Sequence, residues 1–310
     1  DYSGENISGE DFSNRNLAMA GFVATNATNT DFSNSYMLVI DARDIIAPNA
    51  DFSNAILTNA VLTGANLSSS NMNNANLASA MLINTNLSNA DLTNANLSAS
   101  NLSNAILQGV TFSGVNFVGA NLSGVDMSNV DLTGVDFSGV NLTNVNLSNA
   151  TLNNVNFSGA DLTNANLSGC SLENTIFNGT IVSNVDFSGL DLSEASIQNI
   201  DFSGVNFNQT DFEGLDLSGM TFNNAIFKDA IMTNVNFSNA NLKNVVFKDS
   251  CLLSGLNLSG ANLYKSFFDL DDDIDVSSIT FDNTDLSFST MMMMNLSGIN
   301  LSSAVLIGCN

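Results

Sequence analysis

Alternating carboxylates form the sharpest local chemical signal in this sequence. Every second position of one acidic stretch carries an aspartate: Asp269, Asp271, Asp273 and Asp275. Oxygen ligands at this spacing are typical of calcium-binding loops. The motif is incomplete, because Ile274 stands where the sharp-turn glycine belongs and Thr280 where the bidentate glutamate belongs. The stretch predicts either a weak calcium site or a solvated charged bulge, and the incomplete motif favours the bulge.

Residues for catalysis are scarce. The chain has no histidine, which removes the commonest general base and the commonest metal ligand. The sequence also shows no nucleophile–base constellation, no glycine-rich phosphate loop and no long loop that could build a pocket. Its three cysteines, Cys170, Cys251 and Cys309, lie too far apart for a disulfide framework or a zinc pattern. We expect a protein that is not an enzyme and has no cofactor beyond the weakly indicated calcium.

The charge balance excludes one class of partner. The 310 residues include 30 Asp and Glu but only 6 Lys and Arg, a formal net charge of −24. Binding of nucleic-acid phosphates needs clustered cations, so nucleic acid is not an expected ligand. Hydrophobic residues make up 44% of the chain, enough to fill a core. Apolar runs are far shorter than the roughly 20 residues of a membrane-spanning helix, so we expect no membrane insertion.

A period of five residues runs through almost the whole chain. Every fifth residue from Phe52 to Leu252 is apolar, and the same register reaches back to Tyr2. A small residue, usually Ala or Val, stands two positions earlier, with Asn or Asp between them; Ser or Thr and then Asn or Gly follow. This period fits neither a helix nor a strand. It predicts two inward and three outward residues per unit, in a coil that turns a corner every five residues.

Units such as Ala90-Asp91-Leu92-Thr93-Asn94 and Val135-Asp136-Phe137-Ser138-Gly139 resemble the pentapeptide-repeat family, over nearly the whole chain. The resemblance implies an all-β fold, a right-handed quadrilateral parallel β-helix (a pentapeptide-repeat solenoid) with about 20 residues per coil. At the spacing of paired strands it implies a rod about 70 Å long. We expect a single solenoid domain over residues 1–310.

Two segments interrupt the repeat. Residues 38–48 lose the motif but keep the register, which predicts an irregular side within one coil. After Leu252 the register slips by one residue, and an acidic insertion at 269–280 follows before the repeat resumes at Phe281. In this register Cys170 takes an inward position and Cys251 an outward one.

Coils of 20 residues would align several carboxylates on one side of the solenoid. The aspartates separated by multiples of 20 are Asp11, Asp31, Asp51, Asp91, Asp131, Asp191 and Asp211. Neighbours such as Asp31 and Asp51 would lie about one strand spacing apart, where like charges repel. Two interpretations stay open, a cation-binding or recognition ladder and a merely hydrated face. Screening of exposed charges by salt favours the hydrated face.

The ends of the solenoid give the preferred functional hypothesis. The apolar column begins at Tyr2 and continues to Leu306 without an amphipathic or charged cap, whereas soluble solenoids need polar caps. We expect a structural subunit that stacks head-to-tail with copies of itself, because contacts between unlike ends do not close and so yield a filament. The predicted interface residues are Tyr2, Ile7, Phe12, Met291, Leu296, Leu301 and Leu306.

The first residue favours export, and two other functions stay open. The chain opens at Asp1 without an initiator Met, which favours an extracellular or cell-surface protein after removal of a signal peptide. The family resemblance also suggests an acidic DNA-mimic rod that modulates a DNA-binding enzyme such as DNA gyrase. Those relatives resemble dimers joined through a C-terminal helical module, whereas the repeat continues to the C-terminal residues here. Ice or surface binding ranks lower, because the outward Thr residues are scattered among Ser and Asn.

Overall fold

The protein is described by a computed structural model that places residues 1–271, 274–292 and 294–310. Within these residues the chain forms turns, isolated bridges and short strands, and no helix. No segment among them is therefore a helix long and apolar enough to cross a membrane. The chain divides into two compact units, which we call unit 1 (Asp1–Ala165) and unit 2 (Asn166–Asn310).

The pentapeptide Asp51–Ala55 shows why five residues make one side of a coil. The Phe52 N–H donates to the Asn71 carbonyl (2.7 Å), and the Ala55 N–H closes a tight turn onto the Phe52 carbonyl (3.0 Å). Asn54 adopts the left-handed conformation (φ 56°) that the third residue of such a turn requires. Asn and Gly tolerate this conformation better than other residues, which explains why they dominate this position throughout the repeat.

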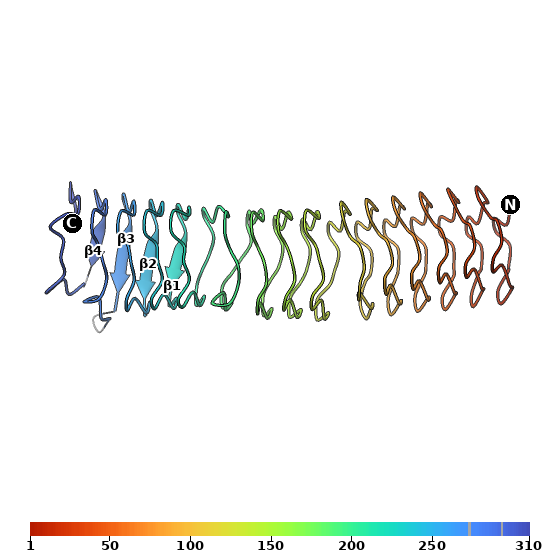
Figure 1. Cartoon of the computed structure of the whole chain (residues 1–310), viewed down its shortest axis with the longest axis horizontal. Helices are drawn as coiled ribbons and strands as arrows, with labels where there is room; N and C mark the ends of the chain where they lie inside the picture. The colour runs from red at the N-terminus through yellow and green to blue at the C-terminus, as the bar shows by residue number, and fades with distance from the viewer. Residues whose placement is uncertain (272–273, 293) are drawn as a thin grey trace. The chain divides into compact units, whose positions relative to one another are not determined.

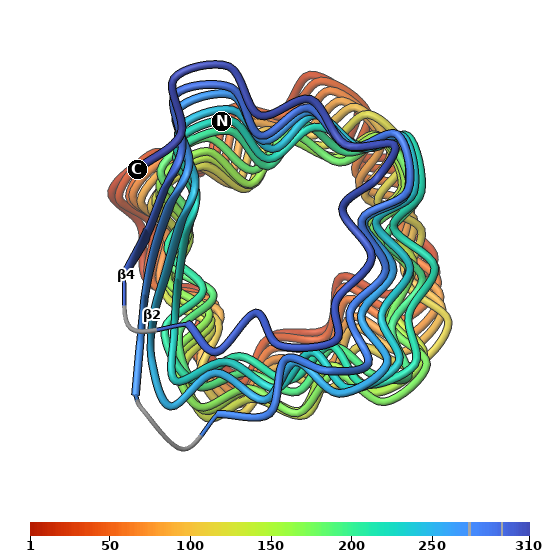
Figure 2. The same ribbon diagram turned by 90° about the vertical axis from the view of Figure 1, so that its left-hand side faces the viewer.

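Four such pentapeptides complete one coil, which brings each residue beside the residue 20 positions later. Parallel bridges join Asp31 to Asp51 and Asp51 to Asn71 in the first unit, and Asn206 to Ile226 in the second. The coils of each unit follow one another as a ladder (Figure 1), and the view along the coils shows their four-sided course (Figure 2). The predicted coil length is confirmed.

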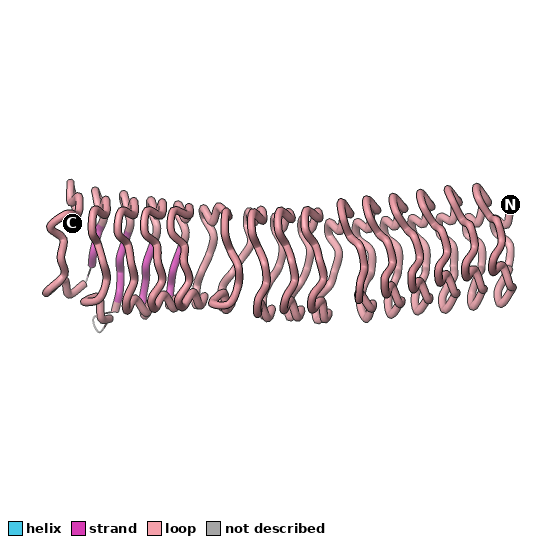
Figure 3. The backbone as a smooth tube through the Cα atoms, viewed as in Figure 1, coloured by secondary structure: helices cyan, strands magenta, loops and turns pink. Residues whose placement is uncertain are grey.

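Continuous strands occur along one side of unit 2 (Figure 3). They are β1 (Ile226–Lys228), β2 (Val246–Asp249), β3 (Phe267–Leu270) and β4 (Thr290–Met292). All pair in parallel and in sequence order, with Phe227 opposite Phe247 and Phe247 opposite Phe268. The rings of these phenylalanines stack with centroids 5.2 and 4.8 Å apart. Stacked phenylalanine rings thus lie along the side of unit 2 where the coils form continuous strands.

The core of each unit holds the two inward residues of every repeat. The fifth-residue column, for example Phe52, Leu142 and Phe202, is buried, and so are the small residues that precede it. Inward hydroxyls lose their contact with water, and most of them donate to a backbone carbonyl instead. Thr30 Oγ1, for instance, lies 2.8 Å from the Ile7 carbonyl oxygen of the preceding coil. Such bonds offset the cost of burying a polar group.

The irregular side predicted for residues 38–48 is wrong. The segment forms the same turns and bridges as its neighbours, with Ile40, Ala42, Ile45 and Ala47 buried. Val39 and Asp44 occupy the left-handed turn positions (φ 55°) although neither is Asn or Gly. The coils on both sides fix the backbone through the ladder, so an unfavourable turn residue costs stability of roughly 1–2 kcal/mol without changing the path.

The register slip is real but begins earlier than predicted. Leu252 is 49% exposed and Leu253 is 1% exposed, so Leu253 takes the inward place. The extra residue enlarges the corner at the end of β2, where Lys248, Asp249 and Ser250 stand in place of the usual two residues. Cys251 is consequently buried, and its predicted outward position is wrong.

The acidic insertion enlarges one coil of unit 2. Bridges there join Asn257 to Thr280 and Asn262 to Asp285, residues 23 positions apart. Leu270, Val276 and Ile279 point their apolar side chains into the core, and Phe281 and Leu286 are buried as predicted for the resumed repeat. The insertion is therefore tied to the core on both flanks.

Candidate interaction surfaces

The outward Asn or Asp of each repeat has two hydrogen-bonding tasks. Its side-chain oxygen accepts the N–H two residues later, as Asp51 does from Ser53 (2.8 Å). Where the residue is Asn, its amide often donates to the same position of the preceding coil, as Asn71 does to Asp51 (3.1 Å) and Asn236 to Asp216 (2.9 Å). An aspartate accepts but cannot donate, so it begins such a ladder. This position thus stabilises the turn and links coils.

The predicted aspartate column is only partly continuous. Bridges pair Asp11 with Asp31 and Asp31 with Asp51 in unit 1, and Asp191 with Asp211 in unit 2. Asn71 separates Asp51 from Asp91. Hydrogen bonds from the hydroxyl and backbone N–H of Ser13 hold the pKa of Asp11 below its ordinary value. Thr133 lowers the pKa of Asp131 in the same way, through a 2.6 Å bond from its hydroxyl.

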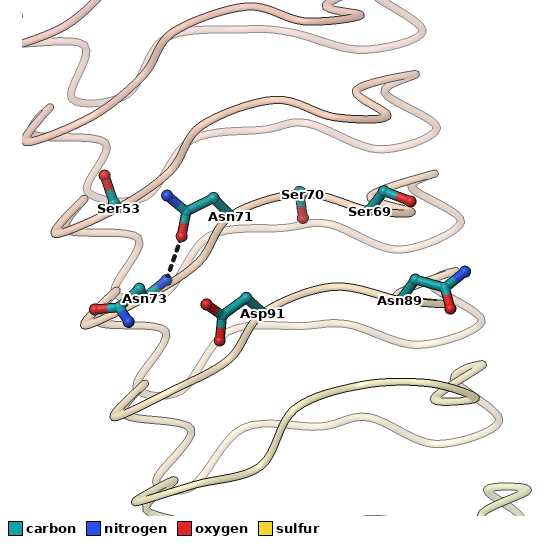
Figure 4. Close-up of a pocket in the computed structure, with 7 residues that line it drawn as sticks. All are labelled: Ser53, Ser69, Ser70, Asn71, Asn73, Asn89 and Asp91. Carbon is teal, nitrogen blue, oxygen red and sulfur yellow. Dashed lines mark hydrogen bonds between the residues drawn. The ribbon is translucent and has the colours of Figure 1, made fainter.

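A polar depression of about 400 Å³ lies beside this column in unit 1 (Figure 4). It is lined by small polar residues of successive coils: Ser53, Ser69, Ser70, Asn71, Asn73, Asn89 and Asp91. The Asn73 N–H donates to Asn71 Oδ1 (3.1 Å), and Thr93 donates to Asp91 through its backbone (2.9 Å). These residues offer hydrogen bonds to water or a hydroxyl-bearing ligand. They include no nucleophile paired with a general base.

The structure describes only part of the acidic stretch that was predicted to bind calcium. Among the residues that the structure places, no three Asp, Glu, His or Cys side chains could hold a metal ion. Asp271 Oδ2 accepts the Ser250 hydroxyl (2.6 Å), and Asp275 Oδ1 accepts the Ser277 N–H (2.9 Å). Asp273 lies outside the described residues. Calcium binding stays a prediction.

The residues predicted to form an interface are less covered than their counterparts one coil inward. Tyr2 and Phe12 are half-buried, whereas Phe22 and Phe32 are inaccessible to solvent. Leu296 and Leu301 are half-buried and Leu306 is 42% exposed, whereas Leu286 is fully buried. Met291, in β4, is half-buried, and Ile7 is nearly buried. Each set lies on a terminal coil of its own unit.

A seam within unit 1 escaped the sequence prediction. The backbone N–H groups of Phe112 and Phe117 make no ladder bond to the following coil, although Leu102 and Leu122 on either side do. A cavity of about 600 Å³ opens there, between residues 110–115 and 131–136. These residues keep the repeat motif, so nothing in the sequence marks the seam. Turn bonds persist on both sides of it, as from Val115 to Phe112 (3.1 Å) and from Val135 to Leu132 (2.9 Å).

Comparisons with known proteins agree with this geometry. A scan against protein families matches "Pentapeptide repeat region" to residues 84–157, 110–187 and 157–226. It also matches "Pentapeptide repeats (8 copies)" to residues 42–74 and 210–249. Together these ranges span well over half of the chain. A search of curated proteins found no match.

The solved structures that match parts of this chain include other pentapeptide repeat proteins. HetL, involved in heterocyst differentiation regulation in the cyanobacterium Nostoc, is 26% identical; the match covers 65% of this chain and 86% of HetL, with a TM-score of 0.34. QnrB1, a plasmid-mediated fluoroquinolone resistance protein, is 16% identical over 66% of this chain and 90% of its own, with a TM-score of 0.32. A pentapeptide repeat protein of the Arabidopsis thaliana thylakoid lumen is 24% identical over 42% of this chain and 69% of its own, with a TM-score of 0.21.

The five-residue period, the 20-residue ladder and the family matches all lead to one assignment. The chain belongs to the pentapeptide repeat family, and its all-β fold is the right-handed quadrilateral β-helix of that family.

Proposed function

We propose that this pentapeptide repeat protein is a non-catalytic structural subunit that associates with copies of itself, the first coil of one against the last coil of the next. The observation that carries the proposal is the apolar side chains on the two terminal coils of the 310-residue polypeptide. The partly exposed residues include Tyr2 and Phe12 on one coil and Leu301 and Leu306 on the other. Burial of each such side chain contributes roughly 1.5–3 kcal/mol.

The backbone of the two coils supports an association of unlike ends. Within the described residues, the N–H groups of Leu301 and Leu306 make no ladder bond. In most inner coils the equivalent N–H donates to the carbonyl of the outward middle residue of the next coil, as Leu82 does to Asn101 (2.7 Å). Asp11 and Asn16 are outward middle residues of the first coil, and their carbonyl groups accept no backbone hydrogen bond. Donors at one end therefore match acceptors at the other, which favours heterologous stacking.

Aromatic stacking supports the same arrangement. The Tyr2 ring stacks on Phe22 (centroids 5.1 Å apart, 9° between planes), and Phe12 stacks on Phe32 (5.6 Å, 28°). Each of these rings covers the next coil with one face and leaves the other face for a further coil. Leu296, Leu301 and Leu306 of another copy would supply apolar partners for those faces, and mobile thioethers such as Met291 adapt readily to them.

Sedimentation velocity of the 310-residue chain over a range of concentrations tests the proposal. We expect species larger than a monomer that grow with concentration. Leu301→Lys or Leu306→Lys should abolish growth, because either places a charge where an apolar contact forms. Ser302→Lys is the matched control, since it adds the same charge at an exposed position of the same coil. This control should still associate.

Two results would overturn the proposal. One is a wild-type chain that stays monomeric at every concentration. The other is association that Leu301→Lys and Ser302→Lys weaken equally, because that outcome would assign the effect to net charge and not to the apolar coil. Circular dichroism of each variant establishes that the coil is still folded.

A further inference from the structure

One corner of unit 2 departs from the residue types of the repeat in three successive coils. Elsewhere the two turn residues are mostly Ser or Thr followed by Asn or Gly. Here Lys243 precedes Asn244, Tyr264 precedes Lys265, and Phe288 stands at the second turn position of the third coil. The backbone course is unchanged, since the Lys265 N–H still donates to the Ser287 carbonyl (3.0 Å). The substitutions therefore alter the surface and not the fold.

A cavity of about 430 Å³ lies at this corner, and we call it the lysine–tyrosine corner. It is lined by Lys243, Asn244, Asn262, Tyr264, Lys265 and Asp285. The Lys265 ammonium lies 5.2 Å from the centre of the Tyr264 ring. Phe288 packs edge-on against that ring, with centroids 5.6 Å apart. The corner thus combines cations, aromatic surface, amides and one carboxylate.

The local backbone tolerates these large side chains at a cost. Lys265 and Phe288 both adopt left-handed conformations (φ 58° and 60°), which long or bulky side chains disfavour. The Phe288 ring also requires Gly308, because a Cβ atom there would come within 2.9 Å of the ring. Asn at position 265 and Ser at position 264 would relieve the strain and satisfy the repeat. The residues present are thus not those that the turn itself favours.

The electrostatics of the corner favour an anion. Lys243 and Lys265 are exposed, and neither forms an ion pair within the described part of the chain. This contrasts with Lys228, which pairs with Asp229 and Asp249 at 2.9 Å each. Two unpaired ammonium groups beside one carboxylate, that of Asp285, leave the corner with a local excess of one positive charge. A single negative charge on a ligand would match that excess.

The remaining polar groups favour hydroxyls over a phosphate. The Tyr264 N–H is held by Asn262 Oδ1 (3.1 Å) and the Lys265 N–H by Ser287, so these backbone groups are not free to form an anion nest. Within the described part of the chain, the Asn262 amide nitrogen and Asp285 Oδ2 make no hydrogen bond, so they can serve as donor and acceptor for hydroxyls. The Asp285 carboxylate would repel a doubly charged phosphate. An aromatic ring face suits the C–H face of a sugar ring.

We propose that the lysine–tyrosine corner binds an acidic saccharide whose carboxylate lies between Lys243 and Lys265 and whose ring packs on Tyr264. Asn262 and Asp285 bond its hydroxyl groups. The ligand class is a uronate-bearing oligosaccharide, and this binding is independent of the association of terminal coils.

Isothermal titration calorimetry of the 310-residue chain with hexagalacturonate tests the inference. We expect saturable binding that Lys265→Asn and Tyr264→Ser each weaken by about tenfold, because a charge-assisted bond or a ring contact is lost. Both variants install a residue of the repeat, so they should fold and melt no lower than the wild type. Lys248→Ser is the matched control, since it removes one positive charge elsewhere in unit 2 and should leave the affinity unchanged.

Neutral and inorganic probes separate the acidic saccharide from other ligands. Maltohexaose should bind at least about tenfold more weakly than hexagalacturonate, because it lacks the carboxylate. Inorganic phosphate should not compete at equal concentration. The inference is overturned by absence of hexagalacturonate binding, by equal losses in Lys265→Asn and Lys248→Ser, or by phosphate that binds as tightly as the saccharide.

Discussion

The fifth residue of each repeat is the side chain on which the core depends most. Leu142 is inaccessible to solvent, whereas its chain neighbour Thr143 lies at the surface turn. We expect Leu142→Asp to lower the free energy of unfolding by more than about 4 kcal/mol, because it buries an unpaired charge. Thr143→Asp adds the same charge outside and should change that free energy by no more than about 0.5 kcal/mol. Urea unfolding measures both, and equal effects would contradict the inward and outward assignment.

The buried thiol of Cys251 gives a pH-dependent prediction at the same scale. Burial raises the pKa of Cys251, and its Sγ lies 3.1 Å from the Phe227 and Lys248 carbonyl oxygens. The folded state therefore favours the neutral thiol. Its contribution to stability is full below the ordinary cysteine pKa of about 8.5 and is lost as pH rises above it. We expect the wild type to lose more stability than Cys251→Ala between pH 8 and pH 10, measured by thermal melting; parallel curves would contradict this.

At the scale of the element, the five-residue register determined which residues could be predicted from the sequence to lie inward. The period placed inward residues such as Phe281 correctly, because burial of a fifth-residue column is a direct consequence of coil geometry. The prediction for residues 38–48 is wrong because the neighbouring coils hold the turn in place even where the motif is lost. The register also failed at Leu252, because an apolar residue in register can stand outside when the preceding corner gains a residue.

The seam in unit 1 and the lysine–tyrosine corner had no periodic signal. Val110 and Val115 satisfy the repeat although the adjacent ladder is open. Tyr264 and Lys265 are separated in sequence from Lys243 and Phe288. The corner forms because successive coils place these residues beside one another. Sequence alone also left the metal-binding capacity of the acidic stretch open, since it did not place the carboxylates relative to one another.

Hydrogen exchange should reveal the seam as the weakest part of the unit 1 ladder. The amides of Phe112 and Phe117 lack the ladder bond that protects those of Leu102 and Leu122. Amides without such bonds exchange at lower opening free energies, so we expect the former pair to exchange faster. Exchange resolved by peptide mass spectrometry measures this. Uniform protection from residue 100 to residue 125 would contradict an open seam.

At the scale of the whole molecule, net charge opposes the proposed association. Each copy carries −24, so two copies repel while their terminal coils attract through apolar contacts. Salt screens the repulsion but leaves burial of apolar surface intact. We expect association to strengthen as sodium chloride rises from about 0.05 M to about 0.5 M, measured by sedimentation velocity. Dissociation on adding salt would contradict an apolar junction and indicate an ionic one.

Electron microscopy of the wild-type chain, concentrated at about 0.15 M salt, tests most directly whether terminal coils associate end to end. The account predicts linear assemblies of copies joined at their terminal coils, because contacts between unlike ends do not close into a ring. Leu301→Lys, examined in parallel, should yield discrete particles. Discrete wild-type particles at every concentration, or assemblies that Leu301→Lys leaves intact, would contradict it.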